Sequence, residues 1–241
     1  MTMSLGTLPA AMLDATSATL AEMPGVRAVA LDAAWAEHIG QMRDQVATIR
    51  SYAWEAPPLA WFRVALLGVG SRTSVLSLLA FPQLAYNLPL LGAEIVCINE
   101  SVTMAIIDWV PMSPAAPGSA EVARIRQQFA HLPNSAELPD WAAGSFSPHL
   151  FYVRPQTSLS AAALLAVFHA YVQGYVQMCA TAAPAGDPAT TFATQERFCF
   201  TELARTPGGA MLTRLFGAEW AAAYARAFLF RPGGQQVLLT A

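Results

Sequence analysis

Two β-branched runs that lie close together constrain the fold of this chain most. Residues 93–98 and 103–110 are rich in isoleucine and valine, and the polar stretch Asn99-Glu100-Ser101 joins them. This arrangement is typical of two antiparallel strands in a hairpin. Both faces of each strand are mostly apolar, so we expect the sheet that contains them to be covered on both sides.

The segments around the hairpin indicate what covers the sheet. Six segments are expected to be helical: 8–22, 29–47, 121–131, 158–180, 192–204 and 210–228. Short apolar runs typical of strands are 75–80 and 150–154, and Pro57-Pro58 marks a break. The order of helices, strands and helices predicts an antiparallel sheet between helical layers. No linker divides the chain, which predicts a single domain over residues 1–241.

Composition excludes several classes of protein. Hydrophobic residues make up 55% of the chain and charged residues 12%, the reverse of a disordered protein. The net charge of −3 offers no basic surplus for nucleic acid. All thirteen basic residues are arginine, which excludes a Schiff-base lysine and a phosphate-loop lysine.

The apolar stretch 161–180 is expected to be a buried helix and not a membrane span. His169, Gln173 and Gln177 interrupt it, and no basic residues follow its end. The N-terminus lacks a basic region before a hydrophobic core, and Asp14 lies where a signal peptide would be apolar. We therefore expect a cytoplasmic protein.

The sequence offers no common cofactor or metal motif. It contains no dinucleotide-binding glycine pattern, no phosphate loop, no GxSxG and no HExxH. The three cysteines, Cys97, Cys179 and Cys199, form no CxxC pair and are interpreted as reduced, buried thiols. We expect no metal site.

Glu94 is the most informative residue, because its carboxyl group interrupts an apolar strand. It either faces solvent from an edge strand or lines a cavity. In a cavity, desolvation would raise its pKa and make it a proton donor near neutral pH. If Glu94 pairs with Ile106, Asp108 lies diagonally on the same face, and two carboxyls share one site. A slip of one residue would place Asp108 on the other face. Alternatively, Asp108 is a strand-end carboxylate that bonds the loop at Pro111.

Charge is unevenly distributed along the chain. Residues 191–241 carry a net charge of +2, and the first 190 residues carry −5. The C-terminal section either offers a basic patch to an acidic partner or is a solvated helix face.

Four groups of residues, in order, resemble the ferredoxin-dependent bilin reductases. Residues 80–96 read AFPQLAYNLPLLGAEIV and are followed by IIDWVP at 106–111. ELPDW begins at Glu137, and FSP at 146–148 precedes FYVR at 151–154. LFGAEW at 215–220 precedes FLF at 228–230. The resemblance covers roughly residues 45–230.

The resemblance implies a three-layer α/β/α sandwich with a central antiparallel β-sheet. A linear tetrapyrrole, such as biliverdin, would lie between the sheet and the C-terminal helices. Single electrons from ferredoxin and protons from side chains would reduce it, with no bound metal or flavin.

The family's site residues map onto this chain one by one. The central sheet carboxylate, usually aspartate, falls on Glu94; the related red chlorophyll catabolite reductases have glutamate there. The histidine of the phycocyanobilin-forming members falls on Ser77, and their buried glutamate falls near Ala65. The second acid, from an Asn-Asp pair, falls on Arg205-Thr206.

These correspondences predict a catalytic Glu94 and a tetrapyrrole-binding site. The residues expected to contact the substrate are Ser77, Asp108, Arg63, Arg154, Arg205 and Thr206, with the arginines meeting propionates. Two alternatives stay open. The substrate is instead an open tetrapyrrole derived from chlorophyll, or the protein binds a bilin without reducing it, as the missing second acid would favour.

Overall fold

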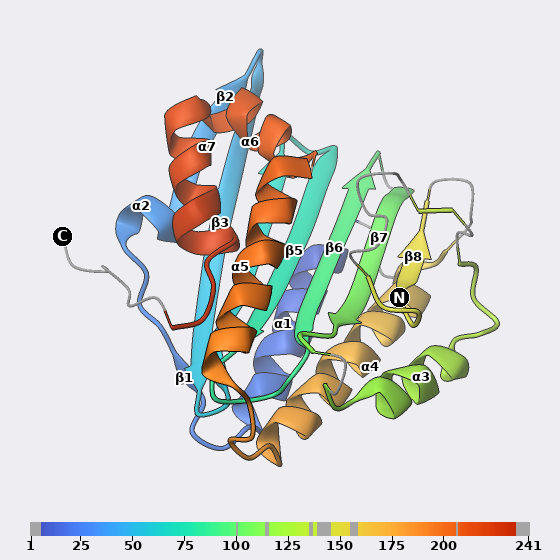
Figure 1. Ribbon diagram of the computed structural model, residues 1–241. Helices are drawn as coiled ribbons and strands as arrows, with labels where there is room; N and C mark the ends of the chain where they lie inside the picture. The colour runs from blue at the N-terminus through green and yellow to red at the C-terminus, as the bar shows by residue number, and fades with distance from the viewer. Residues whose placement is uncertain are drawn as a thin grey trace.

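An antiparallel sheet forms the middle layer of the molecule (Figure 1). The computed structural model describes residues 6–99, 101–113, 116–134, 137–138, 146–154, 159–205 and 207–234. In this part of the chain, eight strands pair in the order β1-β3-β4-β5-β6-β7-β8, and β2 also pairs with β3. The strands are β1 (Arg27–Ala28), β2 (Glu37–Met42), β3 (Gln45–Ala56), β4 (Leu59–Val69), β5 (Thr73–Pro82), β6 (Leu90–Ile98), β7 (Ser101–Val110) and β8 (Phe151–Val153).

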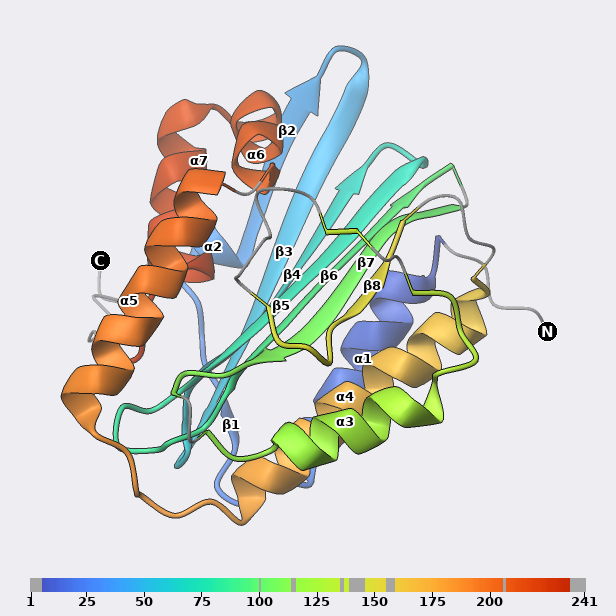
Figure 2. The same ribbon diagram turned by 45° about the vertical axis from the view of Figure 1, so that its right-hand side comes forward.

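Helical layers lie on both sides of the sheet (Figure 2). The helices are α1 (Leu8–Ala21), α2 (Ala33–Ala36), α3 (Ser119–Gln128), α4 (Ala161–Ala180), α5 (Pro188–Arg205), α6 (Gly208–Phe216), α7 (Ala218–Tyr224) and a π-helix (Ala225–Leu229). Helices α1, α3 and α4 cover one face, and α5, α6 and α7 cover the other. The predicted three-layer α/β/α sandwich is confirmed.

Strand alternation assigns each side chain to one of these layers. On the first face, Leu78 and Ile95 pack in one core with Phe168 of α4. On the second face, Leu67 packs in a separate core with Leu215 of α6. Odd-numbered residues of β5 and even-numbered residues of β6 therefore point toward the C-terminal helices.

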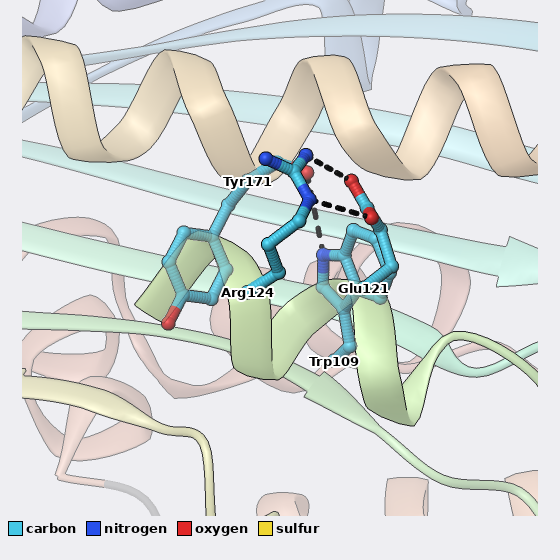
Figure 3. A network of polar contacts seen from close by, with 4 residues as sticks. All are labelled: Trp109, Glu121, Arg124 and Tyr171. Carbon is cyan, nitrogen blue, oxygen red and sulfur yellow. Dashed lines mark hydrogen bonds and ion pairs between the residues drawn. The ribbon is translucent and has the colours of Figure 1, made fainter. Parts of the chain in front are cut away.

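Polar contacts help to fix the α3–α4 layer to the sheet (Figure 3). The indole N–H of Trp109 on β7 donates to the backbone carbonyl of Tyr171 on α4, at 3.3 Å. Its ring stands edge-on to that of Tyr175, with centroids 5.7 Å apart. The ion pair between Glu121 and Arg124 lies on the exposed side of α3. These contacts lie on the sheet face opposite α5–α7.

The predicted hairpin is confirmed as β6 and β7. Glu94 pairs with Ile106, the register considered in the sequence analysis, and Gly92 pairs with Asp108. Asn99 begins the turn with a φ of 50°, a left-handed conformation that asparagine tolerates. The register places Glu94 and Asp108 on the same sheet face.

The prediction of one helix over 29–47 is wrong. Only α2 is helical there, and the chain continues as β2 and the start of β3. The Trp35 and His38 rings both contact Trp220 of α7, with centroid distances of 6.1 and 4.3 Å. Trp35 and His38 lie three residues apart, as neighbours on a helix would, but they do so because both pack against the same residue of α7.

Two long strands, β3 and β4, were not predicted. Pro57 and Pro58, interpreted only as a break, lie in the turn between them. Alternate residues of β3 such as Ala47 and Ile49 are buried, whereas β4 is a nearly continuous apolar run. The apolar run of β4 does not by its pattern distinguish a buried strand from a buried helix.

Helix α4 replaces the predicted helix 158–180. It begins at Ala161, and the Ser160 hydroxyl caps it by accepting from the Ala163 N–H at 3.1 Å. Residue 158 lies outside the described residues. Of the helices that the structure describes, none combines the length and hydropathy that a bilayer-spanning segment needs.

Helix α6 approaches the β2–β3 hairpin closely at Gly40. A Cβ atom at this position would collide with the backbone carbonyl oxygen of Leu215 and with the Phe216 ring. Glycine is therefore required for α6 to rest on β2.

Candidate active site

A cavity of about 730 Å³ separates the second sheet face from the C-terminal helices. Its floor includes Ser77, Glu94 and Ile106, and its roof includes Glu202 of α5 and Met211 of α6. Most of the other lining side chains are apolar. The cavity therefore suits a largely apolar ligand with a few polar contacts.

The sheet register determines the floor. Four residues that lie opposite one another on neighbouring strands form a row across the sheet: Ala65 on β4, Ser77 on β5, Glu94 on β6 and Ile106 on β7. The small side chains of Ala65 and Ser77 leave space beside the longer Glu94 side chain. Ser77 thus lies in the cavity beside Glu94, and its contact with substrate stays a prediction.

Glu94 is not an edge-strand carboxylate. Strand β6 lies between β5 and β7, and the Glu94 side chain lines the cavity. Burial, and secondarily the nearby charge of Glu202, raise the pKa of Glu94 from 4.5 to about 7. A group with such a pKa is partly protonated at neutral pH, the state that general acid catalysis requires.

A second acid, Glu202, faces the cavity from α5. It is only 8% exposed, and its Oε1 atom has no hydrogen-bond partner among the described residues. Burial raises the pKa of Glu202 to about 7, and the charge of Arg205 opposes this shift. Two carboxyls of similar pKa therefore line one cavity from opposite layers.

The sequence analysis missed Glu202 and described the second acid as absent. The family's acid falls on Thr206, which lies outside the described residues. Glu202 precedes that position by four residues in the sequence. The sequence did contain a signal for a buried Glu202: it recurs at helical spacing with Gln195 and Cys199, and the three form one buried face of α5.

Asp108 shares the sheet face of Glu94 but does not line the cavity. It is fully buried and accepts hydrogen bonds from the Ser147 backbone N–H at 2.6 Å and hydroxyl at 2.5 Å. Burial raises the pKa of Asp108, although the bonds from Ser147 oppose the shift. Asp108 thus holds the loop at Ser147, not the loop at Pro111, and its expected contact with substrate stays a prediction.

Arg63 is likewise placed away from the substrate space. It is 3% exposed, and its guanidinium donates to the backbone carbonyls of Phe228, Leu229 and Arg231. Burial, and secondarily the charge of Arg231, lower the pKa of Arg63 to about 9. The group also lies over the Trp61 ring, 5.0 Å from its centroid. Arg63 therefore anchors the end of the π-helix and is not among the residues that line the cavity; its propionate contact stays a prediction.

The other predicted arginines also lie outside the cavity lining. The Arg154 guanidinium lies over the Tyr152 ring, 5.8 Å from its centroid. Arg205 ends α5 and acts on Glu202 through its charge. The cavity wall carries a different arginine, Arg226 of the π-helix, which the sequence analysis did not select.

Comparisons with known proteins agree with this site and fold. The family model described as ferredoxin-dependent bilin reductase matches residues 13–231. Phycoerythrobilin:ferredoxin oxidoreductase of Gloeobacter violaceus is 28% identical over 199 residues, which cover 78% of this chain and 81% of that protein. The 15,16-dihydrobiliverdin:ferredoxin oxidoreductase of the same organism is 25% identical over 194 residues, covering 76% and 78%.

A solved structure has the same fold. Phytochromobilin synthase from tomato, in complex with biliverdin, superposes with a TM-score of 0.77 at 20% identity. The match covers 91% of this chain and 81% of that chain. Together with the match of the family model over most of the sequence, these findings show that the chain belongs to the ferredoxin-dependent bilin reductase family.

Proposed function

We propose that this protein reduces a double bond of a linear tetrapyrrole held in the cavity between the sheet and α5–α7. Electrons come from reduced ferredoxin, and protons come from Glu94 and Glu202. One observation carries the assignment of residues: two carboxyls with a pKa of about 7 line opposite walls of the same mostly apolar cavity.

The stoichiometry requires two proton transfers. Reducing one carbon–carbon double bond adds two electrons and two protons, and ferredoxin delivers its electrons one at a time. Each electron makes the tetrapyrrole more basic, so a proton follows from a nearby acid. A carboxyl with a pKa near 7 donates that proton and then recovers one from solvent.

The arrangement supplies these protons from two sides. Glu94 lies on the sheet and Glu202 on α5, so a flat ligand between the layers has one acid on each side. Ser77 contributes space and a hydroxyl beside Glu94. No resident metal or flavin takes part in this proposal, because electrons pass from ferredoxin directly to the substrate.

Anaerobic incubation with biliverdin and reduced ferredoxin tests the function. We expect binding of biliverdin to change its absorbance spectrum, and addition of reduced ferredoxin to shift that spectrum to shorter wavelength. A bound spectrum that stays unchanged after electron supply would identify a bilin carrier. Turnover of an open tetrapyrrole derived from chlorophyll, without turnover of biliverdin, would identify the other alternative.

A further inference from the structure

Helix α5 carries Glu202 over the cavity, and the chain is fixed just before this helix begins (Figure 1). The backbone N–H groups of Ala185 and Gly186 both donate to the Ala85 carbonyl, at 3.0 and 2.8 Å. Ala85 lies in the loop that joins β5 to β6. The start of α5 is therefore tied to the sheet strand that holds Glu94.

Gln195 makes a second connection, from within α5. Its side chain is fully buried on the inner face of the helix. The amide nitrogen donates to the Pro82 carbonyl at the end of β5, at 2.9 Å, and the amide oxygen accepts from the Gly233 backbone N–H, at 2.6 Å. One amide thus joins α5 to the sheet and to the segment that follows the π-helix.

The contact is close enough to require glycine at position 233. A Cβ atom there would lie 2.8 Å from the Pro82 carbonyl oxygen and 3.1 Å from the Gln195 amide oxygen. Any larger residue would therefore force the helix, the strand end and the C-terminal segment apart. The amide connection at Gln195 depends on this close approach.

Glu202 has no comparable attachment of its own. Its Oε1 atom has no hydrogen-bond partner among the described residues. Its neighbours on α5, Phe200 and Leu203, are exposed. Glu202 follows Gln195 by seven residues, about two helical turns, and both belong to the buried face of α5. The height of the Glu202 carboxyl above the sheet is thus determined by how the preceding turns are attached.

We propose that Gln195 is a positioning residue, which holds α5 against the end of β5 and so keeps the Glu202 carboxyl opposite Glu94. This inference rests on the proposed function, in which both acids donate protons. Gln195 does not line the cavity, so it acts through Glu202 and not on the substrate. Proton donation requires the acid to lie within hydrogen-bonding distance of the reacting atom, and misplacing such a group by ~1 Å can cost ~100-fold in rate.

A double-mutant cycle tests this role. The single-turnover rate with biliverdin and reduced ferredoxin is measured anaerobically for the parent, Gln195→Met, Glu202→Gln and the double variant, and the dissociation constant of biliverdin is measured for each. Methionine keeps the size of the side chain but forms neither bond. Gly233→Ala disturbs the same contact from the other side and replaces Gln195→Met if that variant does not fold. Trp109→Phe is the matched control, because it removes a buried bond to a backbone carbonyl on the opposite sheet face, outside the cavity lining.

We expect Gln195→Met to lower the rate by at least about tenfold, with a dissociation constant within about twofold of the parent value. In the Glu202→Gln background the same substitution should change the rate by less than about twofold, because the acid that it positions is already removed. Trp109→Phe should keep the parent rate.

Three results would overturn the proposal: a parent-like rate in both Gln195→Met and Gly233→Ala, an equal loss of rate from Gln195→Met in both backgrounds, or an equal loss in Trp109→Phe. The first would show that the connection is not needed, and the other two would show a general structural effect. A parent protein that binds biliverdin and leaves it unreduced would instead refute the proposed function on which the inference rests.

Discussion

Replacing Glu94 by glutamine should stop proton transfer while preserving the binding of bilin. Glutamine keeps the shape and the hydrogen-bonding capacity of the side chain but supplies no proton at neutral pH. Loss of a general acid typically lowers a rate by ~100- to 10,000-fold. We therefore expect the single-turnover rate of Glu94→Gln to fall by at least about 100-fold, with a similar dissociation constant for biliverdin.

The environment of Glu94 makes this carboxyl an effective donor. With its ordinary pKa of 4.5, only about 0.3% of the group would be protonated at pH 7. With a pKa of about 7, about half of it is protonated, a gain of about 150-fold in the reactive form. Above neutrality the acid is lost, so the rate should fall about fivefold between pH 7 and pH 8.

The assay is anaerobic stopped-flow absorbance of preformed protein–biliverdin complex mixed with excess reduced ferredoxin, at several pH values. Glu94→Asp is the conservative variant, which keeps an acid on a shorter side chain and should retain the fall in rate with pH. Glu196→Gln is the matched control, because Glu196 is an exposed acid of α5 outside the cavity lining. A bilin radical should accumulate in Glu94→Gln, since electrons still arrive.

A parent-like rate in Glu94→Gln would refute the reasoning, because an amide, which supplies no proton, would then suffice at this position. The variant Glu202→Gln tests whether Glu202 is the second proton donor. Removing the Glu202 charge also removes one of the two influences that raise the pKa of Glu94. The fall in rate with pH should therefore begin at lower pH in Glu202→Gln than in the parent.

Three further predictions concern partner binding and stability. Turnover should slow as salt rises if acidic ferredoxin docks near the arginines of 191–241, because screening shortens to roughly 8 Å at physiological ionic strength; steady-state rates at low and high salt test this. Arg63→Met should lower the midpoint of urea unfolding, since each buried carbonyl left without its donor costs about 1–3 kcal/mol; an unchanged midpoint would contradict the anchoring role. The raised pKa values of Glu94, Glu202 and Asp108 mean that the folded state keeps protons that the unfolded state has lost, so the unfolding free energy should decrease from pH 4.5 to 7 in urea titrations; a rise over that range would oppose it.

The hairpin of β6 and β7 and the first acid could be predicted because their signals are local. The β-branched runs and the Asn99 turn define the hairpin but leave its register open, and the structure pairs Glu94 with Ile106. The charge of one residue among apolar neighbours singled out Glu94 as either a cavity carboxylate or an edge-strand carboxylate. The choice between cavity and edge required the neighbouring strands β5 and β7, which sequence patterns alone do not pair.

The rest depends on contacts between distant segments. Arg63 was expected to meet a substrate propionate because guanidinium matches carboxylate geometry, yet its guanidinium donates to backbone carbonyls 165 to 168 residues later. Glu202 was missed because the family's second acid maps onto Thr206, four residues later in the sequence. The segment 29–47 was misjudged because Trp35 and His38 share a partner on α7, far away in the sequence.

The contact at Gly40 gives the β2–β3 hairpin an influence on substrate range. Helix α6 forms part of the cavity roof through Met211. The same helix packs on β2 at Gly40, where the absence of a side chain allows the Leu215 carbonyl to approach the strand closely. Any side chain at position 40 would push α6 away from β2 and so increase the distance between α6 and the sheet. The height available to a ligand is therefore adjustable from the outer edge of the sheet, while every atom that touches the ligand keeps its identity.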